Sequence, residues 1–344
     1  SSRFRIRQYI PTLVENGIEV HDYLRKFSTE TASSRDIKLR IRHSPRLLIK
    51  AAIHESANLI HRFHDALECN KYDLVWLSRQ LIIGYPSFEG LIKKPIVYDI
   101  DDAIFLKSKL ANIQFKMMAQ RAEVVIAGND FLAEEASKYC KNISIIPTAV
   151  DTQRWKPLLT KKTELLSHSD KFTIGWSGTS SSFKFFIPLE HEIKKFLIEF
   201  PASELIFMSD RFPKELRVLG PFIKFVKWSE AEEVKFVQSI DVGLMPIADD
   251  CWSMGKCAYK GLLYAACGIP VIMTPIGVNA ELLKSSDIGF GPKSSGEWYE
   301  NLRVLFLDRI LGKRLGGNGV ELVNRDYSLK ACAPKIIGVL KRSA

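Results

Sequence analysis

Two lysines and a glycine-containing turn have the residue types and the spacing of a phosphate site. Lys256 and Lys260 are four residues apart, so they share one face of the helix that we predict at residues 256–267. A short apolar segment, residues 271–274, then leads into the turn GVN at residues 277–279, where another helical pattern begins. The N–H groups and the positive dipole end of a helix N-terminus attract anions. We therefore expect a phosphate group to bind where these cations and this turn converge.

A second turn of small and hydroxylated residues follows the apolar segment 172–176. Its sequence is SGTSSSFK, at residues 177–184, and it includes Gly178, Thr179 and Lys184. Glycine lets the backbone come close to a ligand, and a turn of this kind offers N–H and hydroxyl donors to phosphate oxygens. We expect it to contribute to the phosphate site, and the alternative is a flexible surface loop.

Three carboxylates, Asp99, Asp101 and Asp102, follow the strand predicted at residues 94–98. Burying an unpaired carboxylate is very costly, and ligands of parallel sheets bind at the carboxyl ends of the strands. We therefore expect all three in a crevice rather than in a core. The alternative is that they cap a helix that begins near Ala103, although a single aspartate would suffice for capping.

Apolar runs alternate with helical patterns in both halves of the chain, which indicates two α/β domains with parallel sheets. We predict an N-terminal domain at residues 1–157, a polar linker at 158–171 and a C-terminal domain at 172–326. A last helix, within residues 327–344, is expected to cross back to the first domain. The chain does not begin with Met, so we also expect a first strand to precede this numbering.

The composition is that of an ordinary globular protein, with 46% hydrophobic and 26% charged residues. No run of 18 uninterrupted apolar residues is present, so the sequence predicts no transmembrane helix. The six cysteines have neither metal-site spacing nor a disulfide pattern, which favours a reducing cytoplasm. The net charge of +10 favours a polyanionic binding partner. No nucleic-acid-binding motif appears in the sequence.

Residues 35–50 form a basic, periodic segment. Its cations are Arg35, Lys38, Arg40, Arg42, Arg46 and Lys50. A cationic amphipathic segment can lie on an anionic membrane surface, and we expect this role here. The alternative is an ordinary surface helix with solvated charges.

The C-terminal half resembles the donor-binding segment of GT-B glycosyltransferases, close to the retaining family-4 (group-1) enzymes. The resemblance rests on ACGIPV at residues 266–271 and on GVNAE at residues 277–281. The chain departs from the family where that group has two glutamates, because Gly255 and Leu263 occupy those positions. It departs again at Thr179, which replaces an arginine.

This resemblance implies a GT-B fold, with two Rossmann-like domains facing each other across a cleft. It implies transfer of a sugar from a nucleotide-sugar to an acceptor hydroxyl, with retention and without a metal or another cofactor. The implied donor-binding residues are Gly178, Thr179, Lys184, Lys256, Lys260, Val278, Asn279 and Glu281. Asp101 and Asp102 are the implied catalytic residues, which would orient or deprotonate the acceptor. The implied acceptor- or sugar-binding residues are Ser2, Arg3, Arg5, Arg79, Asp99 and Asn129.

Three alternatives compete with this prediction. Loss of the family glutamates favours a catalytically silent GT-B protein that binds a nucleotide or a partner. The Asp99-Ile100-Asp101 pattern also occurs in the metal-dependent GT-A fold, but a second parallel domain has no place there. Nucleic-acid binding by residues 35–50 would require strongly salt-dependent affinity, and we expect none. We expect a glycan, a lipid-linked or a small-molecule acceptor, and a cytoplasmic protein that associates peripherally with the inner face of the membrane.

Overall fold

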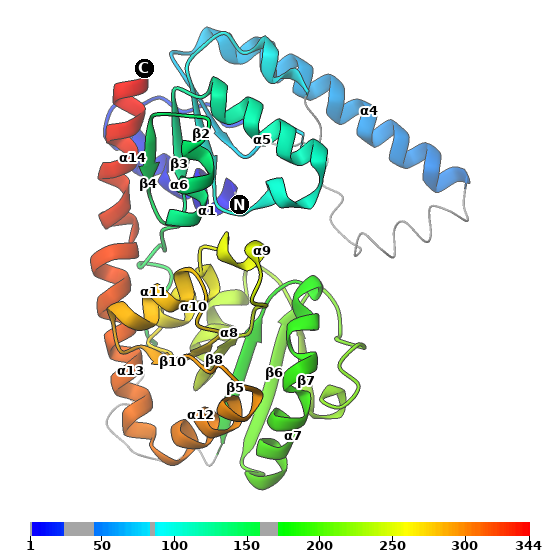
Figure 1. Cartoon of the computed structure of the whole chain (residues 1–344), viewed down its shortest axis with the longest axis vertical. Coiled ribbons are helices and arrows are strands. Elements are labelled where there is room, and N and C mark those ends of the chain that lie inside the picture. The colour runs from blue at the N-terminus through cyan, green and yellow to red at the C-terminus, as the bar shows by residue number, and fades with distance from the viewer. Residues whose placement is uncertain (1, 24–44, 83–86, 159–170) are drawn as a thin grey trace. The chain divides into compact units, whose positions relative to one another are not determined.

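The computed structural model describes residues 2–23, 45–82, 87–158 and 171–344 of the chain, and at residues 45–55 it describes the backbone alone (Figure 1). These residues form two compact units. Unit 1 comprises Ser1–Pro147 and Ala333–Ala344, and unit 2 comprises Thr148–Cys332. The predicted linker, residues 158–171, lies mostly outside the described residues, as does most of the basic segment 35–50.

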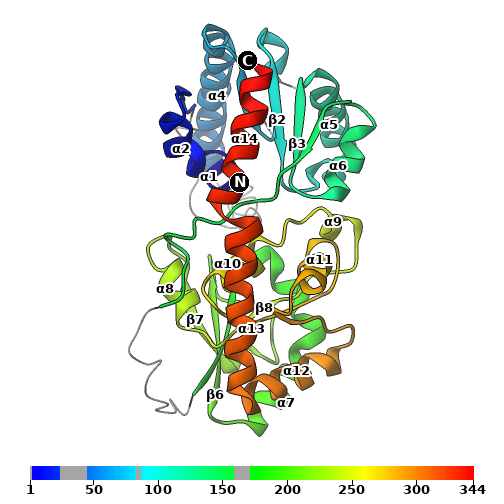
Figure 2. The ribbon, with the colours of Figure 1, turned by 90° about the vertical axis from the view of Figure 1, so that its left-hand side faces the viewer.

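Unit 1 contains a parallel sheet with the strand order β1-β2-β3-β4. Its strands are β1 (Val75–Ser78), β2 (Ile96–Ile100), β3 (Val124–Ala127) and β4 (Ile143–Ile145). Its helices are α1 (Ser2–Arg5), α2 (Ile10–Glu15), α4 (Pro45–Glu68), α5 (Lys109–Arg121), α6 (Asp130–Ser137) and most of α14 (Leu329–Ser343). Every residue of β2 is buried, as expected of a central parallel strand. Figure 2 shows α5 and α6 together on one face of β2 and β3.

Unit 2 contains a parallel sheet with the strand order β10-β9-β8-β5-β6-β7. Its strands are β5 (Phe172–Ser177), β6 (Ser203–Ser209), β7 (Ile223–Lys227), β8 (Val242–Met245), β9 (Val271–Met273) and β10 (Gly289–Phe290). Its helices are α7 (Glu190–Glu199), α8 (Glu233–Gln238), α9 (Cys251–Met254), α10 (Tyr259–Ala266), α11 (Val278–Ser285), α12 (Ser295–Leu307) and α13 (Arg309–Leu322). Numbered from β5, this is the 3-2-1-4-5-6 order of a Rossmann sheet.

Two hydrophobic clusters pack in unit 2, and both include residues of its strands. One contains Trp176 of β5 with the aromatic rings of Phe183, Phe186 and Phe207 around it. The other is built mainly by α10, whose residues from Gly261 to its end are all buried. Because α10 and β5 are fixed by these cores, the loops at the carboxyl ends of the strands start from rigid positions.

The segment before α10 differs from the predicted helix at residues 256–267. The chain forms a short helix, α9, which Asp250 caps by accepting the Ser253 N–H at 2.7 Å, and α10 begins only at Tyr259. Ala258, between them, has a left-handed backbone with φ of 50°, which no helix continues through. Lys256 therefore does not share a helix face with Lys260, and that part of the prediction is wrong.

The first residues of the chain also differ from the prediction. The resemblance implied acceptor-binding residues there, but Ser2–Arg5 forms α1, and Arg5 at its end is buried. No helix in the described part of the chain is both long and apolar enough to span a membrane.

Candidate functional site

The residues with phosphate chemistry lie at the carboxyl edge of the unit 2 sheet. The strands β9, β8 and β5 are neighbours, and the segments that follow them contain the predicted donor-binding residues. The strand order reverses between β5 and β8, because β6 and β7 extend the sheet to one side of β5 and β8 to β10 to the other. In open parallel sheets a ligand binds at this reversal.

Lys260 of α10 reaches the backbone of the turn after β5. A Cβ atom added at Gly178 would collide with the Lys260 Nζ atom and with the Trp176 ring. The same ammonium lies 5.1 Å from the centre of the Trp176 ring, in cation–π contact. A side chain at position 178 would therefore displace the Lys260 ammonium from the backbone and press on the buried Trp176 ring. The structure brings together Gly178 and Lys260, which the sequence predicted as parts of one site.

The ammonium of Lys260 is incompletely neutralised. Burial, reinforced by the nearby Lys256 cation and opposed by Glu233, lowers the pKa of Lys260 to about 8. Among the described residues, no carboxylate lies within ion-pair distance of the Lys260 Nζ atom. A bound anion would supply the missing countercharge, so the electrostatics of this position favour a phosphate.

The turn after β5 is held by the end of β6. The Gly178 N–H donates to the Met208 carbonyl at 3.0 Å, and the Ser209 hydroxyl donates to the Gly178 carbonyl at 2.7 Å. The Asp210 carboxylate accepts the Ser180 N–H at 2.6 Å and the Ser180 hydroxyl at 2.8 Å. Burial would raise the pKa of Asp210, but these hydrogen bonds outweigh it and lower the pKa. Sequence analysis missed Ser209 and Asp210, although their position at the carboxyl end of the strand beside β5 was a usable signal.

Thr179 and Lys184, the other predicted residues of this turn, lie differently. The Thr179 hydroxyl is 2.9 Å from the Ser181 hydroxyl. Lys184 is exposed in the 3-10 helix Ser180–Phe185, with its ammonium 5.0 Å from the centre of the Phe185 ring. The structure therefore does not bring Lys184 into contact with Lys260 or Gly178.

The turn after β9 begins α11 as predicted. Gly277 has φ of 53°, a conformation that suits glycine, and its α-carbon packs near the backbone of Met254 in α9. Val278 is the first helical residue, so the helix itself cannot satisfy its N–H. The Asn279 side chain is buried and donates to the Thr274 carbonyl at 3.0 Å, while its backbone N–H donates to the Ile276 carbonyl at 3.1 Å. Asn279 thus shapes the turn, and within the described residues the Val278 N–H has no hydrogen-bond acceptor.

Glu281, the last predicted donor-binding residue, is exposed in the first turn of α11. It lies close enough to Tyr327 to affect that phenol. Burial, with the Glu281 charge next in size, raises the pKa of Tyr327 to about 12.

The positions of the two family glutamates are occupied by residues with structural roles. Gly255 ends α9. Leu263 is 4% exposed in the hydrophobic cluster of α10. Neither side chain can accept a hydrogen bond from a ribose hydroxyl, in agreement with the sequence.

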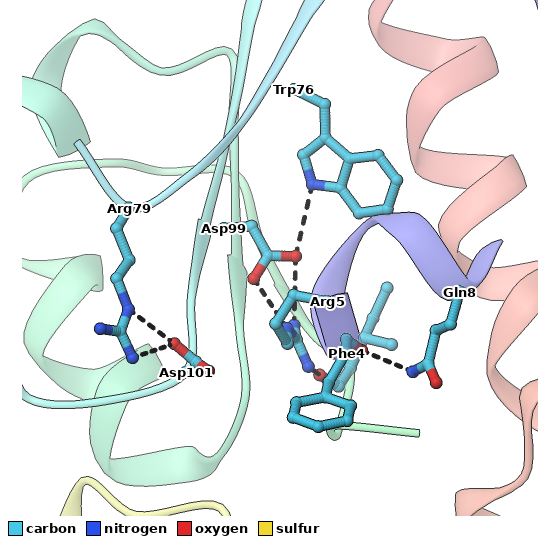
Figure 3. A network of polar contacts seen from close by, with 8 residues as sticks. Phe4, Arg5, Gln8, Trp76, Arg79, Asp99 and Asp101 are labelled. Atoms are coloured by element: carbon cyan, nitrogen blue, oxygen red, sulfur yellow. Dashed lines mark hydrogen bonds and ion pairs between the residues drawn. The ribbon is translucent and has the colours of Figure 1, made fainter. Parts of the chain in front are cut away.

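Unit 1 has a separate polar cluster at the carboxyl ends of β1 and β2. Arg79, directly after β1, donates from Nε and Nη2 to one oxygen of Asp101, both at 3.0 Å, and its Nη2 lies 3.8 Å from Asp102 (Figure 3). The side chains of Arg79 and Asp101 are 21% and 15% exposed, so solvent reaches both. Two charge-assisted hydrogen bonds from one guanidinium fix the position of the carboxylate oxygen that accepts them. Asp101 is thus held in place while remaining accessible.

Backbone strain marks both sites. Among the described non-glycine residues, those with positive φ are Arg79, at 68°, and Ala258, at 50°. Left-handed conformations cost about 1–2 kcal/mol for such residues and persist where surrounding structure imposes them, often at functional positions. One lies beside Asp101 and the other at the start of the helix that holds Lys260.

Asp99 and Arg5 form a buried ion pair instead of contacting a crevice. Arg5 Nε donates to Asp99 at 2.8 Å, Arg5 Nη1 donates to the Ile146 carbonyl at 2.9 Å, and the Trp76 indole donates to Asp99 at 3.3 Å (Figure 3). Both side chains are at most 2% exposed. The expectation that Asp99 faces a crevice is wrong, because Arg5 and Trp76 satisfy it inside the core. A role of either residue in acceptor binding is not supported by this burial.

The remaining predicted acceptor residues belong to other elements of unit 1. Asn129 is buried and caps α6 by accepting the Leu132 N–H at 2.9 Å. Ser2 is exposed in α1, and the Arg3 guanidinium lies 4.5 Å from the centre of the Phe4 ring. In the described part of the chain, no three His, Cys, Asp or Glu side chains gather as a metal site requires.

Comparison with known proteins gives structural matches only. No protein-family model matches the chain. No curated protein matches it either. A structure of Anabaena HepE in complex with UDP and glucose is similar, with 16% identity and a TM-score of 0.66, over 96% of this chain and 88% of that chain. Sucrose-phosphate synthase from Thermosynechococcus elongatus matches with 15% identity and a TM-score of 0.62, over 92% and 81% of the two chains.

A UDP-forming α,α-trehalose-phosphate synthase from Burkholderia xenovorans is also similar, with 12% identity and a TM-score of 0.61, over 93% of this chain and 85% of that chain. These solved structures are GT-B glycosyltransferases. At such identities the likeness shows the fold: the chain is a GT-B protein of the α/β class with two Rossmann-like units. The predicted fold class is confirmed, and the likeness agrees with the resemblance to group-1 glycosyltransferases.

Proposed function

We propose that the protein is a metal-independent glycosyltransferase that moves a sugar from a nucleotide-sugar to an acceptor hydroxyl. The observation that carries this proposal is the position of Lys260, whose ammonium lies against Gly178 where the Rossmann strand order reverses. A cation there, with no ion-paired carboxylate among the described residues, suits the pyrophosphate of a nucleotide-sugar. The UDP bound to the similar HepE structure supports the same class of donor.

Unit 2 would stabilise the leaving group. When the bond between the sugar and the pyrophosphate breaks, negative charge grows on the phosphate oxygen. Lys260 would neutralise that charge, and Lys256, which is close enough to lower the pKa of Lys260, would add a second cation. The Val278 N–H and the positive end of the α11 dipole would contribute to the same charge stabilisation. These groups perform the task that a bound metal ion performs in other transferases.

Unit 1 would bind the acceptor. Two hydrogen bonds from Arg79 hold Asp101 in position, so its carboxylate is placed to take the proton of a hydroxyl group on the bound sugar. Asp102, 3.8 Å from the same guanidinium, would orient that hydroxyl or a neighbouring one. Retention at the anomeric carbon and a glycan or lipid-linked acceptor are part of the proposal and follow from the group-1 resemblance.

The test is a screen of UDP-, GDP-, ADP- and dTDP-sugars in the presence of a chelator, measuring both binding and release of nucleotide. We expect one donor class to bind and to be hydrolysed slowly by the wild type. Lys260→Met should lose donor binding, because the pyrophosphate loses its buried cation. Asp101→Asn should retain binding and lose turnover. Lys284→Met is the matched control, because Lys284 is exposed at the opposite end of α11 from Val278.

The burial of Leu263, which leaves the ribose without the family carboxylate, favours the alternative of a silent nucleotide-binding protein. Binding that depends on Lys260 but gives no turnover, even with sugar acceptors added, would support this alternative. Anomeric proton NMR of a transfer product would test retention. Failure to bind any nucleotide-sugar would refute both functions.

A further inference from the structure

The chain turns at Arg79, between β1 and the segment that follows it. Arg79 has a left-handed backbone, with φ of 68°, which is unfavourable for a residue with a Cβ atom. Such a conformation persists only where the surrounding structure imposes it. On the side of β1, the Arg79 N–H donates to the Asp99 carbonyl at 2.9 Å. The segment after Arg79 must supply the remaining constraint.

Gln80 connects this turn to the strand that precedes Asp101. Its Nε2 atom donates to the phenol oxygen of Tyr98 in β2 at 2.8 Å, and both side chains are buried. Gln80 directly follows Arg79, and Tyr98 lies three residues before Asp101. The hydrogen bond therefore ties the backbone after Arg79 to the strand that leads to its carboxylate partner.

The next two residues, Leu81 and Ile82, are held as well. The Leu81 N–H donates to the Glu89 carboxylate at 3.1 Å. The Ile82 carbonyl accepts a hydrogen bond from the Gln114 side chain at 2.7 Å. Glu89 and Gln114 are both buried. A change at Gln80 alone would leave these two anchors in place, so its effect should be confined to the turn before it.

Gln80 is not the most stabilising residue for its position. Its Oε1 atom is buried and has no hydrogen-bond partner among the described residues. A buried polar atom without a partner lowers stability, and an apolar side chain of similar shape would avoid this loss. The adjacent Arg79 makes two hydrogen bonds to Asp101 (Figure 3). A destabilising side chain directly beside this pair is better explained by the geometry that it imposes.

We propose that Gln80 is a positioning residue, which keeps Arg79 in the left-handed conformation that aims its guanidinium at Asp101. It does so through its hydrogen bond to Tyr98. Without this bond, Arg79 would relax toward the ordinary conformations with negative φ, and its guanidinium would leave Asp101. The carboxylate would then lose the two donors that hold it. The effect on turnover rests on the proposed transferase function, whereas the effect on the direction of Arg79 does not.

Chemical labelling of Arg79 tests the positioning without any turnover. Phenylglyoxal reacts with accessible guanidinium groups that are not paired, and mass spectrometry of the peptide that contains Arg79 gives the labelling rate. We expect Gln80→Met and Tyr98→Phe each to raise this rate severalfold over the wild type. The combined variant, Gln80→Met/Tyr98→Phe, removes both polar partners, so its urea midpoint should stay close to that of the wild type.

Asn70→Ala is the matched control, because Asn70 also makes hydrogen bonds in unit 1, but at the amino end of β2. Its side chain donates to the Leu91 carbonyl at 3.0 Å and accepts the Lys93 N–H at 2.6 Å. This variant should show the reverse result, with a lower urea midpoint and an unchanged labelling rate of Arg79.

Turnover gives the second test, with the nucleotide-sugar that the wild type hydrolyses. Gln80→Met/Tyr98→Phe should keep the donor Kd and lower kcat by roughly ten- to a hundredfold. Gln80→Met should add no further loss to Asp101→Asn, because Gln80 acts through Asp101. Losses in kcat that multiply in Gln80→Met/Asp101→Asn would overturn the proposal, as would unchanged labelling of Arg79 in the Gln80 variants. If the wild type hydrolyses no donor, the proposed function fails, and labelling alone decides whether Gln80 directs Arg79.

Discussion

At the scale of single residues, the candidate donor site depends on one cation and one missing side chain. Lys260 has a lowered pKa because of its burial and the nearby Lys256, and Gly178 provides the space into which its ammonium extends. Neither residue type would mark a site alone. Their contact at the reversal of strand order is what gives the pair its specific chemistry.

Donor affinity should depend on pH through Lys260. Its pKa of about 8 means that the free protein keeps the ammonium charged below that pH and loses the proton above it. A bound pyrophosphate favours the charged form, so the pKa in the complex is higher than in the free protein. Affinity for a nucleotide-sugar should therefore be constant below pH 8 and then fall, by at most about tenfold per pH unit.

Isothermal titration calorimetry across this range checks the prediction, with a nucleotide-sugar as ligand because its pyrophosphate diester does not titrate there. Lys260→Met should bind weakly at every pH and show no such decline. Wild-type affinity that stays constant well above pH 8 would argue against contact between Lys260 and the ligand.

At the scale of elements, the segment from α9 to α11 shows that a family pattern alone does not determine the role of each residue. The left-handed backbone of Ala258 separates the short helix α9 from α10, so α10 starts only at Tyr259. As a result Lys260 lies in the first turn of α10 and Leu263 faces the core. A carboxylate at position 263 would enter a hydrophobic cluster and not a ribose pocket.

Restoring the family glutamate at position 263 should therefore destabilise the protein without improving donor binding. Leu263→Glu would place an unpaired carboxylate in the core, and we expect the free energy of unfolding to fall by about 3–5 kcal/mol. Leu263→Met, which conserves volume, should cost less than about 1.5 kcal/mol. Urea denaturation measures both changes. A stable Leu263→Glu protein with tighter donor binding would show that this side chain reaches the ligand.

Sequence patterns predicted the elements well where burial alone decides them. The apolar runs of β2, β5 and β9 and the glycine that begins α11 are strong local signals. Contacts between residues far apart in the sequence could not be predicted. The pairing of Arg5 with Asp99 joins positions 94 residues apart, and nothing local distinguishes Asp99, which is buried, from Asp101, which is accessible.

The same limit explains the partial success at the candidate donor site. Gly178 and Lys260 were predicted from separate motifs, and their contact could be expected from strand adjacency. The side-chain directions of Lys184, Asn279 and Glu281 depend on packing that motif spacing does not contain.

At the scale of the whole molecule, each unit has its own sheet and its own candidate site, and the last helix contains residues of both units. The helix α14 begins in unit 2, and its residues from Ala333 onward belong to unit 1. Unit 1 is thus built from segments at both ends of this sequence. At the N-terminal end, the ion pair between Arg5 and Asp99 attaches α1 to the sheet.

Breaking this ion pair should destabilise unit 1 strongly. Arg5→Met leaves the Asp99 carboxylate buried without its partner, and we expect a loss of about 3–5 kcal/mol in the free energy of unfolding. Arg5→Met/Asp99→Asn should recover part of it. The matched control is Arg7→Met, because the Arg7–Asp22 pair is 40% and 33% exposed and should contribute less than about 1 kcal/mol. Equal effects of Arg5→Met and Arg7→Met in chemical denaturation would contradict the structural role of the buried pair.

The most direct test of the candidate donor site is the affinity of Gly178→Ala for nucleotide-sugars, measured by calorimetry in the presence of a chelator. The added methyl group would displace the Lys260 ammonium and press on the Trp176 ring, without removing any charge. We predict that wild type and Lys284→Met bind one nucleotide-sugar equally well, and that Gly178→Ala, while still folded, binds it at least about tenfold more weakly. Undiminished binding by a folded Gly178→Ala protein would contradict the account, because the ligand would then not lie where Gly178 and Lys260 meet.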